Sequence, residues 1–186
     1  MYKPFGIIPM AGGNSGAQFA GWFKKEIQSM DDLKGLKMRI PGLAGEVLQR
    51  AGAVPVTLTG GEIYSSLQSG AIDGTEWVGP YNDLAFGFYQ AATYYYSSIW
   101  HEPGTGLEFL INEKALKELP KDLQKIVEVA ARAVNESTLD EYNARNNAAL
   151  QTLVEKHNVQ MRKLPPEVIS ELKEITAQVM AEQAAN

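Results

Sequence analysis

The sequence contains no cysteine, which excludes disulfides, thiolate metal sites and cysteine nucleophiles, but is compatible with either a reducing or an oxidising compartment. Only two histidines are present, and two isolated histidines without cysteine make a zinc site a poor interpretation. No run of about 18 apolar residues occurs, so no segment is predicted to span a membrane. The first ten residues, MYKPFGIIPM, lack the pattern of a secretory signal; if the protein is exported, we expect its signal to lie outside this chain.

An excess of positive charge is also missing. The formal net charge is −5, which gives no electrostatic case for binding nucleic acid or an anionic membrane surface. An anionic small ligand stays compatible with this balance, because one local arginine outweighs a modest global charge. The apolar fraction of 45% and the charged fraction of 21% are those of an ordinary globular protein. The 186 residues suffice for one substantial core, or for one domain with an appendage.

The first two-thirds of the chain alternate short β-rich runs with helical patterns. Glycines and caps punctuate them, with Ser29 as an N-cap and Gly35 as a stop. Such alternation is typical of a mostly parallel sheet, so the predicted fold class is α/β. The strands are expected at 5–10, 36–40, 54–58, 71–79, 94–100 and 106–111, and the helices at 16–27, 43–52 and 60–70.

Helical periodicity then continues over residues 120–157. A helix of that length measures about 50 Å at 1.5 Å per residue, whereas a compact domain of this size is about 30–35 Å across. The helix must therefore bend, with the polar NARNN at 143–147 as the expected place, or extend beyond its own domain. A short strand at 159–164 and an amphipathic helix starting after Pro165 and Pro166 are expected to follow.

Several motifs suggest chemistry that their context does not support. GGNSG at 12–16 lacks the ending of a P-loop and is better interpreted as a turn, although Asn14 and Gln18 could present amides to a ligand there. HEP at 101–103 resembles the start of a zinc-protease motif, but no second histidine follows at the required spacing, and Pro103 prevents the helix. His157 is expected at the surface near the end of the long helix, where a cationic group suits the helix dipole.

Signs of an enzyme are equally weak. There is no Gly-x-Ser-x-Gly, and no serine has an evident histidine partner. Glu76 and Glu102, each at a junction of strand and loop, form the nearest acid pair, but nothing in the sequence fixes the separation that a glycosidase requires. We therefore predict that the protein is not an enzyme.

Arg39 stands near the carboxyl end of the strand-like run LKMRIPG. Ligands of open α/β sheets bind at that edge, and a guanidinium there can hold a carboxylate through two parallel charge-assisted hydrogen bonds. The alternative is an arginine at a strand edge in a surface ion pair, and the residues alone leave both interpretations open.

A family resemblance bears on this choice. The stretches GGNSGAQFAGWFKKEI, DDLKGLKMRIPG through AIDGTEWVGPY, and INEKALKELPKDLQKIVEVAARAV resemble, in collinear order, the DctP-type substrate-binding proteins of TRAP transporters. GTEWVGPY followed by YYYSSIWHEPG is most similar to the branch that binds α-keto or α-hydroxy monocarboxylates together with a metal ion. The resemblance implies a clamshell of the type II periplasmic-binding-protein kind, with crossing strands and a long helix packed on both lobes.

The resemblance also implies a site. Arg39 would pair with the ligand carboxylate, and the carboxylate of Glu76, the carbonyl of Trp77, Gln18 and Glu102 would surround a cation that also touches the ligand. Because neighbouring side chains of an extended segment face opposite ways, the Trp77 indole would pack as wall or core. The all-oxygen shell suits Na⁺ or Ca²⁺: two carboxylates favour the divalent ion, the Glu-Trp pairing favours sodium, and the ion is left open. Asn14 would hydrogen-bond the ligand.

Full-length members of the family begin with a signal peptide and a first α/β lobe, so this chain is expected to be a carboxyl-terminal part. Residues 1–119 would form the second lobe with the substrate and cation site, 120–157 the interlobe helix, and 158–186 a strand and helix that pack on the first lobe. Such proteins are periplasmic receptors that deliver an organic acid to a sodium-driven permease. The alternative is a truncated module without a ligand, whose long helix forms a homodimer.

Overall fold

The computed structural model describes residues 1–185 and divides into two compact units. Unit 1 comprises Met1–Ala17 and Gly104–Arg145, and unit 2 comprises Gln18–Pro103 together with the described residues from 146 onward. The division differs from the predicted boundaries after residues 119 and 157. Those boundaries refer to the lobes of a larger clamshell and stay a prediction.

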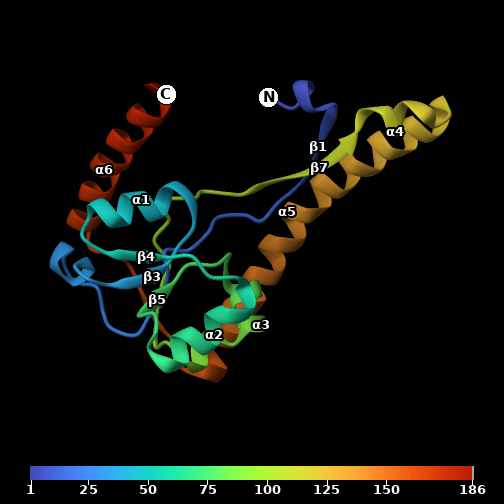
Figure 1. Cartoon of the computed structure of the whole chain (residues 1–186). Coiled ribbons are helices and arrows are strands. Elements are labelled where there is room, and N and C mark those ends of the chain that lie inside the picture. Colours follow the sequence, from blue (N-terminus) through green and yellow to red (C-terminus); the bar gives the residue numbers. More distant parts are fainter. Residues whose placement is uncertain (186) are drawn as a thin grey trace. The chain divides into compact units, whose positions relative to one another are not determined.

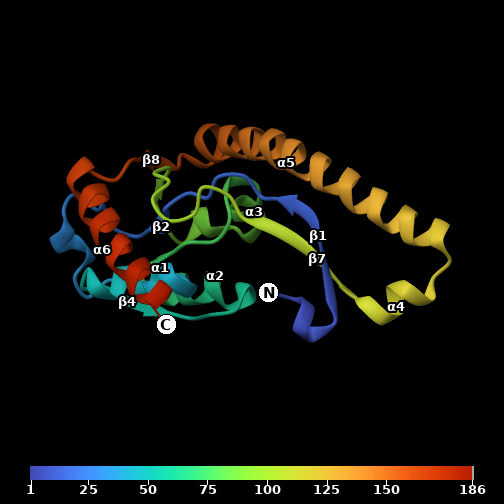
Figure 2. The ribbon, with the colours of Figure 1, turned by 90° about the horizontal axis from the view of Figure 1, so that it is seen from above.

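Unit 1 is built on a two-stranded antiparallel ribbon and a helix (Figures 1 and 2). Strand β1 (Ile7–Asn14) pairs with β7 (Gly106–Asn112), and the register shifts between Ala11 and Gly13. Gly13 has φ +144°, and a Cβ there would lie 2.7 Å from a methyl carbon of Thr138, so the helix and the ribbon approach closely at this point. The remaining elements are η1 (Lys3–Phe5), α4 (Glu113–Glu118) and the first part of α5 (Lys121–His157).

Unit 2 contains a six-stranded sheet in the order β4-β3-β5-β2-β6-β8. Strand β3 is parallel to both β4 and β5, and β6 is parallel to β8, whereas β2 is antiparallel to both of its neighbours. The sheet is thus mixed, and one reversed strand separates its two parallel parts. The bounds are β2 Gly21–Phe23, β3 Lys37–Arg39, β4 Val54–Val56, β5 Gly74–Thr75, β6 Tyr94–Tyr96 and β8 Gln160–Arg162.

Both faces of this sheet are buried. Neighbouring residues of a strand point to opposite faces, and accordingly Trp22 and Tyr95 belong to one apolar cluster while Phe23 and Tyr96 belong to the other. The cluster of Phe23 is covered by α1 and α6, which lie side by side in Figures 1 and 2; that of Trp22 is covered by α2, η3 and the end of α5. The bounds are α1 Gly42–Arg50, α2 Gly60–Ser69, α3 Pro80–Phe86, α6 Pro166–Ala185, η2 Met30–Leu33 and η3 Phe88–Gln90.

The helix predicted over residues 16–27 is wrong. Within that range the structure has an irregular segment followed by β2. Gly21 has φ +120°, and a Cβ there would lie 2.3 Å from the carbonyl oxygen of Thr75, so the chain needs glycine for close strand pairing. The apolar spacing in this range suggested a helix because a strand buried on both faces has consecutive apolar residues and shows no alternation.

Most other elements lie where the sequence predicts them. Ser29 caps η2 with a reciprocal contact from Asp32, and Thr59 caps α2 in the same way through Glu62. The strand predicted at 71–79 is much shorter, since only the two residues of β5 pair in the sheet. The α/β fold class is confirmed.

Helix α5 continues without interruption for 37 residues, or about 56 Å at 1.5 Å per residue. The division between the units falls after Arg145, inside the polar NARNN segment, so one helix supplies residues to both units. Helix α5 thus extends beyond one unit, which is one of the two expected alternatives. Within residues 1–185, no helix combines the length and the apolar character needed to cross a membrane.

Candidate functional site

Arg39 is the last residue of β3, at the carboxyl end of the parallel strands of unit 2. Its side chain is buried, with the residue only 8% exposed, so the alternative of a surface ion pair does not hold. Nη1 donates to the carbonyl of Glu76 at 2.9 Å, Nε donates to the carbonyl of Leu58 at 3.3 Å, and the guanidinium lies 5.0 Å from the centre of the Trp77 ring. Burial lowers the pKa of Arg39, and the nearby Glu76 acts in the opposite direction.

Glu76 follows β5 directly and is 3% exposed. Its backbone N–H donates to the carbonyl of Arg39 at 3.0 Å, which extends the ladder between β3 and β5 by one bond. Its carboxylate lies between two cationic or potentially cationic groups: Oε2 is 3.6 Å from Nη1 of Arg39, and Oε1 is 3.9 Å from Nε2 of His101. Both separations exceed hydrogen-bond length, so the buried carboxylate is attracted electrostatically without being bound tightly by either group.

Gln18 and Glu102 come together on the same unit. The backbone N–H of Gln18 donates to the carbonyl of Glu102 at 3.1 Å, which joins the irregular segment before β2 to the loop after β6. Gln18 is 5% exposed, and Glu102 is partly buried. The structure therefore brings together in pairs Arg39 with Glu76 and Gln18 with Glu102, although the positions lie far apart in the sequence.

Trp77 supplies a wall next to Arg39. Its indole packs partly against the cluster around Trp22, and its ring centre is 5.2 Å from that of Phe86. A Cβ placed on Gly60 would lie 2.9 Å from the Trp77 ring, so the start of α2 rests directly on the indole. This is the packing predicted for the Trp77 side chain.

Asp83 was missed in the sequence, yet it holds the turn after Trp77. One carboxylate oxygen accepts from the Trp22 indole at 2.9 Å and the Tyr95 hydroxyl at 2.8 Å; the other accepts from the backbone N–H groups of Val78 and Gly79. Burial raises the pKa of Asp83 to about 6, against the lowering effect of these four hydrogen bonds. An acid in the first turn of a helix entered through Gly-Pro was the available signal.

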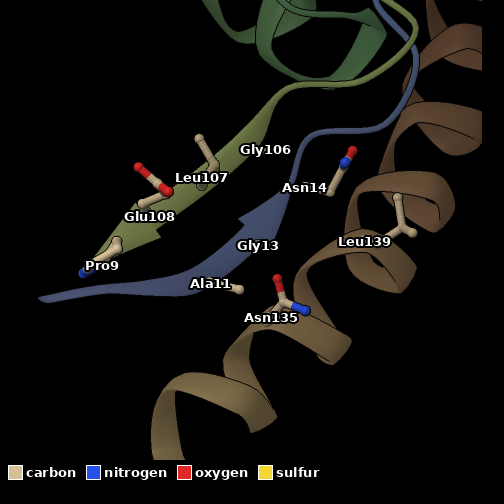
Figure 3. A pocket seen from close by; sticks show the side chains of 9 residues that line it. All are labelled: Pro9, Ala11, Gly13, Asn14, Gly106, Leu107, Glu108, Asn135 and Leu139. Atoms are coloured by element: carbon tan, nitrogen blue, oxygen red, sulfur yellow. The ribbon is translucent and has the colours of Figure 1, made fainter. Parts of the chain in front are cut away.

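Asn14 belongs to unit 1, at the end of β1. Its side-chain oxygen accepts from the N–H of Gly16 at 2.8 Å, which bends the chain locally after β1. Residues 12–14 belong to the strand itself, so the turn predicted over 12–16 is wrong for the first three residues. Asn14 also lines an open pocket of about 540 Å³ between the ribbon and α5, with Asn135 and Leu139 on its helical side (Figure 3). Neither Arg39 nor Glu76 lines this pocket, and a ligand-binding role for Asn14 stays a prediction.

The predicted cation donors are all oxygens: the amide of Gln18, the carboxylates of Glu76 and Glu102, and the carbonyl of Trp77. Within residues 1–185 no group of three or more His, Cys, Asp or Glu side chains could hold a metal, which leaves no zinc-like cluster there. A hard cation such as Na⁺ or Ca²⁺ accepts amide and carbonyl oxygens beside carboxylates, so the donor chemistry fits such an ion. The assignment of these four residues as ligands stays a prediction.

A buried arginine at the carboxyl end of parallel strands, facing a buried carboxylate, is typical of an α/β protein that binds a small polar ligand. Residues 5–186 match the model of the family described as bacterial extracellular solute-binding protein, family 7, or DctP. The chain belongs to this family. Its members are solute-binding proteins, which confirms the prediction that the protein is not an enzyme.

This chain is similar to known proteins in both sequence and fold. The chain is 49% identical over 154 residues to a monocarboxylate 2-oxoacid-binding periplasmic protein of Nostoc, an alignment that covers 83% of this chain and 42% of that protein. A TRAP periplasmic solute-binding protein of Colwellia psychrerythraea, solved with calcium and pyruvate, is 48% identical with a TM-score of 0.94, over 99% of this chain and 56% of that one.

Two further solved structures show which ions and ligands such proteins take. The Pseudoalteromonas atlantica protein, solved with sodium and pyruvate, is 44% identical with a TM-score of 0.91, over 99% of this chain and 56% of that one. The Bordetella bronchiseptica protein, a dimer with calcium and picolinate in one site, is 39% identical with a TM-score of 0.90, over 97% and 54%. This chain thus spans about half the length of these relatives.

Proposed function

We propose that the protein is an extracytoplasmic solute receptor of a TRAP transporter that binds a small 2-oxo or 2-hydroxy carboxylate. Arg39 and a bound Na⁺ or Ca²⁺ hold the ligand, and the loaded receptor delivers it to a sodium-driven permease in the membrane. The observation that carries the proposal is the pair of Arg39 and Glu76, buried together at 3.6 Å in a member of this family.

The arginine has the donors that a carboxylate requires. A guanidinium carries five N–H groups, and the carbonyls of Glu76 and Leu58 take two of them. These two bonds and the Trp77 ring fix the orientation of the planar group, so little conformational entropy is lost when a carboxylate binds to the remaining donors. Burial strengthens the resulting charge-assisted hydrogen bonds.

The cation balances the negative charge of the site. Glu76, Glu102 and the ligand's carboxylate bring three negative groups against the single charge of Arg39. A buried carboxylate is stable only when it is paired or bound to a metal, so a cation among these oxygens offsets the excess. An oxygen at the 2-position lets a ligand chelate the ion through two atoms, which favours 2-oxo and 2-hydroxy acids over simple carboxylates.

Calorimetric titration tests this function. The protein, in the full length that its gene encodes, is titrated with pyruvate, 2-oxobutyrate and lactate in three buffers: one with Ca²⁺, one with Na⁺, and one with chelator and no sodium. We expect saturable binding that requires one of the two ions, with succinate as a control of different length and charge. The absence of a binding signal and of a melting-temperature shift for every 2-oxo and 2-hydroxy acid would overturn the proposal.

A second candidate function is self-association through α5. This helix exposes several large apolar side chains, and exposed apolar surface promotes association. The most exposed are Ile126 and Val129, followed by Val154, Val134 and Leu123. Light scattering separates the candidates: a dimer that Ile126→Glu dissociates and that organic acids leave unchanged favours self-association, whereas a monomer or a ligand-responsive species favours the receptor.

A further inference from the structure

The imidazole of His101 is buried without a hydrogen-bond partner. Its side chain is 5% exposed, and within residues 1–185 neither Nδ1 nor Nε2 has a hydrogen-bond partner. Buried polar side chains in native proteins are hydrogen-bonded in the large majority of cases, and an unsatisfied group carries a desolvation penalty. Two unsatisfied nitrogens on one ring therefore indicate a group that receives its partner from outside the chain.

The surroundings of His101 indicate where that partner binds. The ring lies against Trp100, with ring centres 4.9 Å apart, and its Nε2 faces Oε1 of Glu76 at 3.9 Å. The other oxygen of Glu76, Oε2, faces Nη1 of Arg39. The two oxygens of Glu76 thus separate the arginine from the histidine within one small region of unit 2.

We propose that His101 contacts the ligand directly, with Nε2–H donating a hydrogen bond to the oxygen at the 2-position of the organic acid. This rests on the function proposed above, in which Arg39 holds the carboxylate. A ligand held by Arg39 on the Oε2 side of Glu76 extends its second functional group toward the Oε1 side, where His101 lies. At 3.9 Å Glu76 does not take up the N–H of Nε2 in a hydrogen bond, so this donor is available to an oxygen of the ligand.

The sequence drew attention to this histidine for a different reason. HEP suggested a zinc protease and was rejected, and the rejection left His101 without a role. In the proposed role the imidazole serves as a hydrogen-bond donor to the ligand, and not as a metal ligand.

The test compares substitutions of the two histidines of this sequence, made in the full-length protein. His101→Phe fills the space but has no donor, and His101→Gln retains an N–H near the position of Nε2. His157→Phe is the control, because His157 is exposed and stacks on Tyr89. We expect His101→Phe to weaken pyruvate binding about tenfold, the effect of one hydrogen bond, with partial recovery in His101→Gln and no change in His157→Phe.

Two further readouts separate a ligand contact from a structural role. The ligand-free His101→Phe protein should melt at the same temperature as the wild type or higher, because the substitution removes two unsatisfied nitrogens. In the unmodified protein, addition of pyruvate should shift the ¹⁵N signals of the His101 ring, which are identified by their absence from the spectrum of His101→Gln. This spectrum decides the question if His101→Phe does not fold.

The outcomes distinguish the two proposals. If the wild-type protein binds no 2-oxo or 2-hydroxy acid, the proposed function itself fails. If the wild type binds pyruvate but His101→Phe binds it equally well, or if the His101 ring signals do not move, only the role of His101 is overturned.

Discussion

The two units solve the problem of burying apolar surface in different ways. Unit 2 covers both faces of a six-stranded sheet with helices, and Trp22, Tyr95 and Phe88 are completely buried. Unit 1 has a two-stranded ribbon in which Leu107, Phe109 and Leu110 stay more than 40% exposed. An isolated two-stranded ribbon is marginally stable, whereas a sheet with two covered faces has its own core. Accordingly, the residues with buried charge lie in unit 2.

Glycine substitutions give the largest expected contrast between the units. Gly21→Ala places a Cβ 2.3 Å from the Thr75 carbonyl at a φ of +120°, so β2 cannot pair with β5. We expect a loss of about 4 kcal/mol or more in the free energy of unfolding, measured by urea denaturation. Gly106→Ala in unit 1 is the matched control: no atom lies within 4 Å of its added Cβ, and the free energy should change by about 1 kcal/mol or less. Equal effects at the two positions would contradict the contrast.

Substitution of an arginine should give the second-largest difference in stability between the units. Arg39→Ala leaves the Glu76 carboxylate buried without its arginine, which costs about 3–5 kcal/mol in other proteins, and should also abolish the ligand-induced shift in melting temperature. Arg39→Lys keeps the charge but loses the planar donor array, so part of the stability should return while affinity stays low.

Arg132→Ala is the control for this charge removal in unit 1. Its exposed pair with Glu128 lies on α5, and the substitution should leave both stability and binding unchanged. A ligand response that survives in Arg39→Ala would remove this arginine from the site.

The smallest expected effect concerns pH. Asp83 has a folded-state pKa of about 6, above its ordinary value of 3.8, so between these values the folded protein retains a proton that the unfolded chain loses. The free energy of unfolding therefore falls as pH rises from about 4 to 6 and is then constant, with a total contribution of about 3 kcal/mol. In Asp83→Asn this dependence should be absent, although lost hydrogen bonds make the variant less stable.

Glu128 of unit 1 should make the free energy of unfolding depend on pH with the opposite sign. Lys125 and Arg132 lower the pKa of its carboxyl below 4.5, so its contribution is present above that pH and is lost as the solution becomes more acidic. Denaturation of the wild type, Asp83→Asn and Glu128→Gln at half-unit steps from pH 3 to 7 checks both signs. A constant difference between wild type and Asp83→Asn would show that Asp83 does not titrate in this range.

Local signals in the sequence were sufficient for much of the fold. The length of α5, the cap at Ser29 and the position of Arg39 at a strand end follow from periodicity, capping residues and strand order. The strand β2 was mistaken for a helix because burial on two faces removes the alternation that identifies a strand.

The environment of the polar site residues could not be predicted in the same way. Asp83 is bound by Trp22, 61 positions away in sequence, and the burial of His101 depends on how the loop after β6 packs. Hydrogen bonds between distant positions leave no periodic pattern. For that reason the sequence could propose residues for the site, but it could not predict the turn that Asp83 holds or the unsatisfied histidine.

The contact between Arg39 and Trp77 gives the protein an optical property. Only three tryptophans are present, and the guanidinium lies 5.0 Å from the centre of one of their rings. A positive charge over an indole shifts its emission, so a carboxylate that binds and neutralises Arg39 changes the fluorescence of Trp77. Occupancy of the proposed site can therefore be followed by ultraviolet emission from the unlabelled protein.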